Sequence, residues 1–334
     1  RGVGAARDLP GRAARPRQLL DAAGGVSQII SAIVPTIGRP ASLTRLLEAL
    51  AAQTRRPDEI VVADGSDGDG IGQIVSAPRW REAGLAVRHV RVSPPNAVRQ
   101  RQAAIADCRG SLLLLLDDDV VPEPGCVAAL VSCLEARNAV GVGADFSNQD
   151  WPEPTTLWRW YLRLWHRMSA GEWQGKVVGP LLRFGYHPIP ATAVPMQWLG
   201  SGHALIRRDA YDRAGGFSDF FLHGSSINED VDLGLKLGSV GAMFLCPDAR
   251  MAHMHEPGGR ASARIVAEDD LYNRYCVLRR TQRRSRAAAA GLTLTYFIIE
   301  TLSGIAASAR GWRTNGLGAR FAGRLQALIR IATS

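Results

Sequence analysis

Residues 112–119 read Leu-Leu-Leu-Leu-Leu-Asp-Asp-Asp, so three carboxylates directly follow five consecutive leucines. An apolar run without polar alternation predicts a strand that is buried on both faces, as in a parallel sheet covered by helices. Crowded carboxylates repel one another, and a bound divalent cation removes that repulsion. Ligand sets made only of oxygen atoms suit Mg²⁺ or Mn²⁺. The alternative is a solvated turn between a strand and a helix.

The spacing within this acidic cluster predicts different roles for its members. If the chain stays extended, the side chains of Asp117 and Asp119 point the same way and that of Asp118 points the opposite way. One carboxylate is then free to hold a metal ion while another holds sugar or ribose hydroxyls.

Strand and helix patterns alternate on both sides of the leucine run. Expected strands cover residues 28–35, 59–64, 87–92, 112–116, 139–144, 199–206 and 242–246, the last closed by Pro247. Expected helices cover residues 41–52, 96–108, 124–137, 208–214 and 229–237. This alternation predicts an α/β fold with a doubly wound, mostly parallel sheet. Ligands of such sheets bind beyond the carboxyl ends of the strands, where Asp64 and the acidic cluster fall.

Three segments follow from the change in composition along the 334 residues. Residues 1–27 carry five arginines against two aspartates and predict a disordered basic tail. Residues 28–260 form the expected catalytic domain. Residues 261–334 are helical and basic, and predict an appendage that associates with a membrane.

The net charge of +9 suits three partners: nucleic acid, anionic lipid or a phosphorylated small molecule. No motif typical of RNA or DNA binding is present, so we expect no nucleic-acid partner. The five cysteines form no CxxC pair, which favours a reducing compartment over disulfides or zinc. The amino-terminal residues lack a signal-peptide pattern. A cytoplasmic location, at the inner face of the cell membrane, is expected.

A second acidic group, Asn-Glu-Asp-Val-Asp, occupies residues 228–232. Taken alone, these acids are best explained as the first turn of a helix, where the helix dipole stabilises them. Their order after the other motifs gives them a further meaning.

Seven short motifs, in order, resemble those of the family 2 inverting glycosyltransferases, which have the GT-A fold of the nucleotide-diphospho-sugar transferases. The resemblance covers about residues 29–260. The segments that carry it are Ile33–Pro40, Glu59–Ser66, Arg101–Ile105, Leu116–Asp119, Gly200–Arg208 with Gly215–Phe217, Glu229–Leu233, and Pro247–Arg250 with His253.

For the donor, the resemblance implies a nucleotide pocket lined by Pro35 and Thr36. Asp64 would contact the base, and Arg101 would lie near the base or the phosphates. Asp117 and Asp118 would also contact the nucleotide-sugar, which is expected to be a UDP-, dTDP- or GDP-sugar.

For the chemistry, the resemblance implies that Asp117 and Asp119 hold Mn²⁺ or Mg²⁺ against the diphosphate. His253 is a candidate further ligand, with His255 as the alternative. Asp230 would be the general base, with Glu229 beside it. A single displacement would invert the configuration at the anomeric carbon.

Three other functions are compatible with parts of the sequence. A basic nucleic-acid-binding protein explains the charge but not the acids at strand ends. A nucleotidyltransferase of the same fold usually has a Gly-rich basic loop after the first strand, which residues 35–40 lack. A catalytically silent sugar-nucleotide-binding protein has no need of both Asp119 and Asp230.

Two segments predict peripheral membrane association and a lipid-linked or cell-envelope glycan as acceptor. Apolar side chains recur at helical spacing in residues 157–168, opposite Arg159, Arg163, His166 and Arg167, a pattern typical of an interfacial helix. In the tail, residues 287–309 are long enough to span a bilayer but only weakly hydrophobic. A cluster of arginines precedes them, at positions 274, 279, 280, 283, 284 and 286. We expect this segment to lie on the membrane, although spanning the bilayer and packing on the catalytic domain are alternatives.

Overall fold

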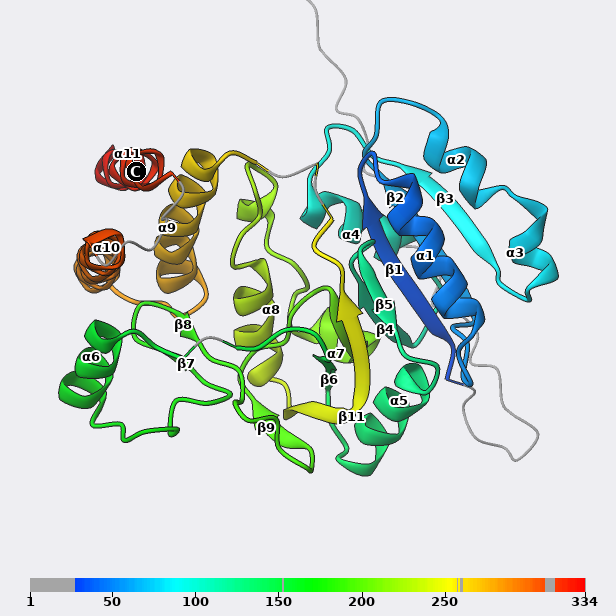
Figure 1. Cartoon of the computed structure of the whole chain (residues 1–334), viewed down its shortest axis with the longest axis horizontal. Helices are drawn as coiled ribbons and strands as arrows, with labels where there is room; N and C mark the ends of the chain where they lie inside the picture. Colours follow the sequence, from blue (N-terminus) through cyan, green and yellow to red (C-terminus); the bar gives the residue numbers. More distant parts are fainter. Residues whose placement is uncertain (1–27, 152, 257, 259–260, 310–315, 334) are drawn as a thin grey trace, which may run out of the picture.

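The computed structural model describes residues 28–151, 153–256, 258, 261–309 and 316–333, so the predicted tail at residues 1–27 lies outside it (Figure 1). The strands are β1 (Ile30–Thr36), β2 (Glu59–Asp64), β3 (Val87–Arg91), β4 (Leu112–Leu116), β5 (Val120–Pro122), β6 (Gly141–Phe146), β7 (Val177–Val178), β8 (Leu182–Arg183), β9 (Val194–Met196), β10 (His203–Arg207) and β11 (Met243–His253). The α-helices are α1 (Pro40–Ala51), α2 (Gly70–Val75), α3 (Pro78–Glu82), α4 (Ala97–Asp107), α5 (Cys126–Ala136), α6 (Thr156–His166), α7 (Arg208–Arg213), α8 (Glu229–Gly238), α9 (Ala263–Arg280), α10 (Arg286–Ala309) and α11 (Leu317–Thr333), with a 3-10 turn η1 at Asp219–Phe221.

The main sheet has the order β3-β2-β1-β4-β10-β6-β11-β5, with β9 paired to β11. Strands β3, β2, β1 and β4 are parallel, as expected, and so are β6 and β11. Strand β10 runs antiparallel between β4 and β6. Helices cover both faces, with α1 on one and α4 on the other (Figure 1). The doubly wound α/β sheet predicted from the sequence is confirmed, with antiparallel strands in its second half.

The leucine run forms β4 at the centre of the sheet, and all five side chains are buried. Leu113 and Leu115 pack into the apolar cluster on one face, and the other three pack into the cluster on the opposite face. At about 1.5–3 kcal/mol for each fully buried side chain, this strand contributes strongly to the core. It also fixes the place where the acidic cluster begins.

Two strand boundaries differ from the expectation. The strand predicted at residues 199–206 begins only at His203, because Gly200-Ser201-Gly202 forms a turn. The strand expected to end before Pro247 continues to His253, since the pairing of β11 with β6 shifts register between Cys246 and Arg250. A bulge of this kind tolerates a proline inside a strand. The continuation carries His253 beside Val120 of β5.

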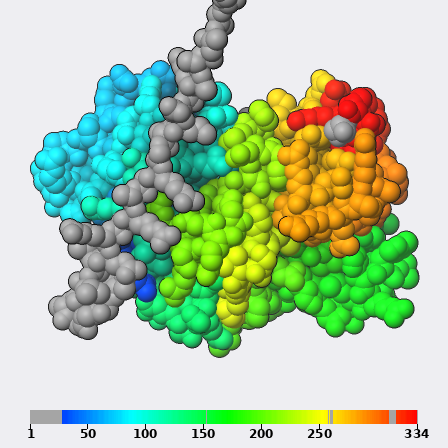
Figure 2. All heavy atoms as spheres, turned by 180° about the vertical axis from the view of Figure 1, so that it is seen from behind, coloured from blue at the N-terminus to red at the C-terminus, as the bar shows by residue number. Residues whose placement is uncertain are grey.

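The three helices of the tail pack together at one end of the molecule. Helix α9 lies along α11 and α10, and α6 lies beside α10 (Figures 1 and 2). Their shared core contains Trp158, Tyr161, Leu162, Leu271, Tyr296 and Ala327, together with Val178, Leu182 and Phe184 of the β7–β8 hairpin. Residues of α9 such as Tyr275 and Val277 also join the main cluster over the sheet. The tail is therefore helical, as predicted, and is packed on the catalytic unit.

Helix α6 is amphipathic, but it packs through Trp158, Tyr161 and Leu162. The apolar side predicted from spacing remains largely outside, with Trp160 57% and Trp165 71% exposed. One arginine of the predicted basic cluster is not on the surface. Arg274 is buried, since its guanidinium binds Asp270 and the carbonyls of Pro180 and Leu181.

Candidate active site

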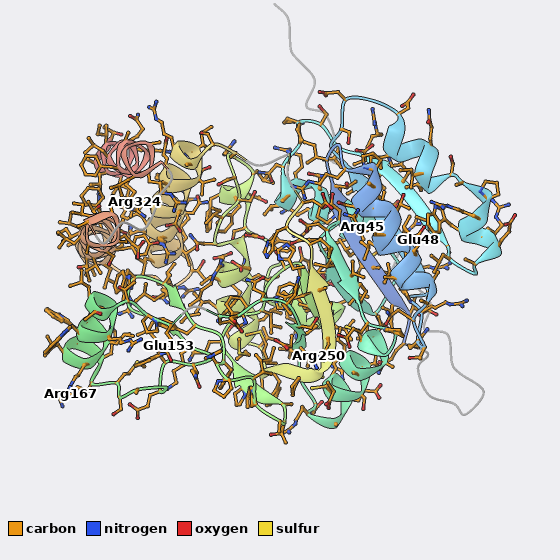
Figure 3. All side chains as sticks on the ribbon, in the orientation of Figure 1. Arg45, Glu48, Glu153, Arg167, Arg250 and Arg324 are labelled. Atoms are coloured by element: carbon orange, nitrogen blue, oxygen red, sulfur yellow. The ribbon has the colours of Figure 1, made fainter. Side chains whose placement is uncertain are left out.

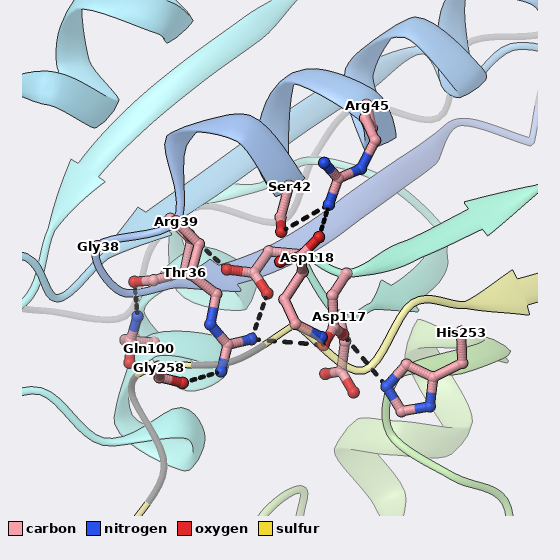
Figure 4. Close-up of polar contacts among 12 residues, drawn as sticks. Thr36, Gly38, Arg39, Ser42, Arg45, Gln100, Asp117, Asp118, His253 and Gly258 are labelled. Atoms are coloured by element: carbon pink, nitrogen blue, oxygen red, sulfur yellow. Dashed lines mark hydrogen bonds and ion pairs between the residues drawn. The ribbon is translucent and has the colours of Figure 1, made fainter.

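A cavity of about 640 Å³ opens beyond the carboxyl ends of β1 and β4. Its wall includes seven residues singled out in the sequence: Pro35, Thr36, Arg101, Asp117, Asp118, Asp119 and His253. The first turn of α4 and the segment at residues 224–227 close the other side. The edge predicted from strand order is therefore hollow and acidic (Figure 4).

Asp118 is turned toward β1 and α1. Thr36 Oγ1 donates to its Oδ2 at 2.6 Å, and Arg39 Nη1 donates to its Oδ1 at 3.0 Å. Burial raises the pKa of Asp118 to about 6, against the hydrogen bond from Thr36 and the charge of Arg39. Arg39 Nη1 also lies 3.5 Å from Asp119 Oδ2, so one guanidinium serves two carboxylates. Asp118 and Asp119 lie in a turn, so the extended chain on which the expected side-chain directions depend does not form here.

Asp119 meets the end of β11. Its Oδ1 lies 3.2 Å from His253 Nε2, and its Oδ2 accepts from the backbone N–H of Glu256 at 3.2 Å. Burial alone would raise the pKa of Asp119, but the hydrogen bond and charge of His253, with the charge of Arg39, hold it below the usual value. The His253 ring stacks on Phe146 and on His255, at centroid distances of 5.1 and 4.0 Å.

The Asp119–His253 pair has the chemistry of a metal site. Two adjacent ligands at ~2.1 Å from an octahedral ion lie ~3 Å apart, close to the observed 3.2 Å. His253 Nδ1 faces Gln149 Oε1 at 3.3 Å; if it donates there, Nε2 presents a lone pair to a carboxylate oxygen. A proton or a metal ion between them resolves that conflict. In the described part of the chain, no three His, Cys, Asp or Glu side chains form a complete site by themselves.

Arg101 joins the cavity to the start of α8. Its Nη2 donates to Asp117 Oδ1 at 2.6 Å, and its Nη1 lies 3.3 Å from Glu229 Oε1. The guanidinium is buried, whereas Asp117 is 38% exposed to the cavity. Asp117 therefore pairs with Arg101, whereas Asp119 pairs with His253.

Glu229 and Asp230 begin α8 and face different neighbours. Ser201 Oγ donates to Glu229 Oε1 at 2.6 Å; burial and the charge of Asp230 raise the pKa of Glu229 to about 7. Asp230 Oδ1 and Oδ2 both lie 2.6 Å from Nη1 of Arg183, on β8. Neither acid lines the cavity.

Two further acids have structural partners: Asp64, a predicted site residue, and Asp232, two positions after Asp230. Asp64 is fully buried, and its carboxylate accepts from the Ser66 amide and lies within 3.0 Å of His89 and Arg91. It does not line the cavity. Asp232 is also fully buried, and it binds Ser218, Lys236 and Thr281, thereby fastening α8 to the end of α9.

Sequence reasoning missed several residues that build this site. Asn96 caps α4 by accepting from the Arg99 amide, and its Nδ2 donates to the carbonyls of Phe221 and Gly224. Gln100 Nε2 donates to the carbonyls of Thr36 and Ala63 at 2.8 Å each, which holds the ends of β1 and β2 together. An asparagine just before a helical pattern is the signal that was available for the cap.

Comparisons with known proteins agree with this arrangement. A family model described as "Glycosyl transferase family 2" matches residues 31–184. The O-antigen biosynthesis protein RfbC of Myxococcus xanthus is 27% identical over 75% of the chain, which spans 19% of that protein's length. An N-acetylglucosaminyl-diphospho-decaprenol L-rhamnosyltransferase of Mycobacterium tuberculosis is 22% identical over 72% of the chain and 82% of its own length.

Among solved structures, a mannosyltransferase of Pyrobaculum calidifontis, in complex with GDP-Man and Mn²⁺, superposes with a TM-score of 0.55. The match covers 90% of this chain and 87% of that one, at 17% identity. The fold is the GT-A fold expected from the sequence.

Proposed function

Because the chain belongs to glycosyltransferase family 2, we propose that it transfers a sugar from a nucleotide-diphospho-sugar to a hydroxyl of a lipid-linked or cell-envelope glycan, with metal dependence and inversion. The observation that carries this proposal is the cavity at the ends of β1 and β4, walled by Asp117, Asp118, Asp119 and His253. Acids around a hollow of this size suit a ligand that brings phosphates and a cation together.

The donor is proposed to lie in this cavity with its nucleotide between Pro35, Thr36 and the start of α4. Arg101 is placed to fix Asp117, whose exposed carboxylate faces the space where the sugar would lie. The carboxylate of Asp64 already binds Ser66, His89 and Arg91, so Asp64 supports the end of β2 beneath the nucleotide and does not contact the nucleotide base.

Asp119 and His253 would hold Mn²⁺ or Mg²⁺, with the remaining ligands supplied by the donor diphosphate and water. The solved relative with Mn²⁺ supports divalent metal use in this fold. When bound, the ion offsets the negative charge that grows on the departing nucleoside diphosphate. Arg39, already beside Asp118 and Asp119, is placed to add positive charge on the same side.

Asp230 is proposed to take the proton from the acceptor hydroxyl as that oxygen bonds to the anomeric carbon. The bond from that carbon to the diphosphate oxygen breaks in the same step, and the nucleoside diphosphate leaves. Attack from the face opposite the leaving group inverts the anomeric carbon. Glu229, whose pKa is about 7, stays near Asp230 and binds Ser201 and Arg101.

The acceptor is proposed to arrive on a membrane that docks against α6, α10 and α11 at the cytoplasmic face. These helices expose ten large apolar side chains: Trp160, Leu164, Trp165, Leu294, Ile298, Leu302, Ile305, Phe321, Leu325 and Ile329. The same helices carry exposed arginines, including Arg167 at the end of α6 (Figure 3). Tryptophan with arginine is the composition of an interfacial surface.

Helix α10 is the only described helix long and apolar enough to cross a membrane, and 17% of its apolar window is buried. Its inner face is polar and bonded: Trp158 Nε1 donates to Glu300 at 2.7 Å, and Tyr296 donates to Asp270 at 2.8 Å. Spanning the bilayer would break these bonds and leave Glu300 in hydrocarbon, at a cost of several kcal/mol. We therefore propose that α10 lies flat on the membrane surface.

Donor binding is tested by thermal shift with UDP-, dTDP- and GDP-sugars, each with and without Mn²⁺. We expect one nucleotide class to stabilise the protein, and more strongly with Mn²⁺. Equal stabilisation in EDTA would refute the metal dependence of donor binding. No stabilisation by any nucleotide sugar would refute the proposed transferase function. Flotation with anionic and neutral vesicles tests the membrane surface; a Trp165→Glu variant should float less.

A further inference from the structure

Arg183 covers the carboxylate that we propose as the general base. Its Nη1 lies 2.6 Å from both oxygens of Asp230, and the guanidinium carbon lies 5.3 Å above the Trp198 ring. The Asp230 side chain is 12% exposed and that of Arg183 is 37% exposed. The cation is thus the side of the pair that faces solvent.

This pairing is incompatible with proton abstraction as it stands. Asp230 Oδ1 accepts from the Val231 amide as well as from Arg183, and Oδ2 accepts from Arg183. An acceptor hydroxyl needs one of these oxygens within about 2.6–3.2 Å to pass its proton. Arg183 must therefore leave at least one oxygen of Asp230 before transfer.

The backbone that carries Arg183 is fixed, so the side chain is the part that moves. Arg274 Nη1 binds the carbonyls of Pro180 and Leu181 in the turn of the β7–β8 hairpin at 3.0 and 2.6 Å. Arg274 also lies 4.0 Å from the ring of Tyr296, on α10. The hairpin is therefore fastened to the helix that we place on the membrane.

We propose that Arg183 recognises a phosphate group next to the acceptor hydroxyl, and that binding this phosphate draws it from Asp230. The inference rests on the proposed function, since it takes Asp230 as the base. The acceptor class it names is a sugar joined through phosphate or diphosphate to a chain. Arg183 then acts as a specificity-determining residue.

The chemistry of Arg183 matches this ligand. A guanidinium binds phosphate through two parallel hydrogen bonds, and it exchanges a carboxylate for a negatively charged phosphate without losing an ion pair. Arg183 does not line the cavity proposed for the donor, so the donor diphosphate would have other partners. An acceptor without phosphate has no anion for Arg183 to bind in place of Asp230.

The test measures donor hydrolysis, in which water replaces the acceptor and passes its proton to Asp230. The donor is the nucleotide sugar found by thermal shift, and the probes are hexyl diphosphate, hexyl glucoside and inorganic phosphate. In wild-type protein, we expect hexyl diphosphate to raise hydrolysis several-fold and hexyl glucoside to leave it unchanged. Arg183→Gln should hydrolyse faster without any probe and show no response, and Arg183→Lys should respond partially.

Arg213→Gln is the matched control, since Arg213 is an exposed arginine paired with Asp209 far from the base. It should behave as wild type. Unchanged basal hydrolysis in Arg183→Gln, or a retained response to hexyl diphosphate, would overturn the assignment. An equal response to inorganic phosphate would overturn the chain-linked acceptor.

Failure of the proposed function gives a different result. If Asp230→Asn hydrolyses donor at the wild-type rate, Asp230 is not the base. If Asp230→Asn is slow while Arg183→Gln matches wild type, only the role of Arg183 is refuted.

Discussion

Asp230 and Asp232 lie two positions apart in the first turns of α8, and changing each to asparagine should separate catalysis from stability. Asp230 pairs with Arg183, whose side chain is 37% exposed. Asp232 is fully buried, with Lys236 Nζ 2.9 Å from its Oδ2. Asparagine has nearly the same shape as aspartate but neither the charge nor the proton affinity.

The Asp230→Asn variant loses the group that we propose accepts the proton. General base catalysis contributes typically 10²–10⁴-fold, so turnover should fall by about that factor, which corresponds to about 3–5 kcal/mol in the barrier. Donor affinity should be unchanged, because Asp230 does not line the donor cavity. Its melting temperature should change little, since its partner Arg183 is 37% exposed.

The Asp232→Asn variant leaves a mostly buried ammonium group, Lys236, without its counter-charge. Breaking a buried pair in this way costs roughly 3–5 kcal/mol, which lowers the melting temperature of a chain of this length by roughly 4–8 °C. Turnover per folded molecule should stay near that of wild type.

The measurements are nucleotide release at saturating donor, donor affinity by calorimetry, and thermal melting of both variants. Turnover of Asp230→Asn within about tenfold of wild type would remove this residue as base. A melting temperature of Asp232→Asn equal to that of wild type would show that the buried network around α8 contributes no stability.

Three further predictions concern the metal, the shape of the site and acid stability. Asp119→Asn should weaken Mn²⁺-dependent donor binding by roughly 10–100-fold, measured by calorimetry with and without EDTA; equal affinities would argue against a ligand at this position. A Cβ at Gly202 would lie 2.2 Å from Asp117 Oδ2, so Gly202→Ala should raise the donor KM about tenfold at an unchanged melting temperature. The control is Gly125→Ala, which has open space around its Cβ and should match wild type in KM. Burial raises the pKa of Asp270, but the charge of Arg274 and three hydrogen bonds hold that pKa below its usual value. The ionised carboxylate therefore stabilises the fold fully above the unfolded pKa of about 3.9, and this stabilisation is lost as the pH falls through the folded pKa. The difference in unfolding free energy between wild type and Asp270→Asn should be constant near neutrality and shrink below pH 4.

The sequence predicted the sheet well where local pattern and burial agree. The five leucines of β4 became a central strand because no other arrangement hides both faces of such a run. The helix at residues 41–52 was found from the spacing of its leucines, and the helix at residues 96–108 was found although its Asn96 cap was missed. The strand β11 was predicted too short, since a register shift that admits Pro247 depends on the partner strand β6 and leaves no local pattern.

The site was predicted less completely, because its charges are balanced by residues from distant parts of the chain. Arg39 lies about 80 positions from Asp118, and Arg183 lies 47 positions from Asp230. The two-residue strands β7 and β8 are too short for a periodic signal, so Arg183 was missed with them. The motif assigned Asp64 to contact with the nucleotide base, and only the fold reveals that its carboxylate oxygens already bind Ser66, His89 and Arg91.

The position of Arg39 has a consequence for how the enzyme matures. Its guanidinium supplies a resident positive charge to Asp118 and Asp119, so these carboxylates can be brought together while the chain folds without a metal ion. Protein purified throughout in chelator should then be fully folded, and binding of the proposed ion would be a late, reversible event. A shortage of that ion would leave an intact reserve of the enzyme.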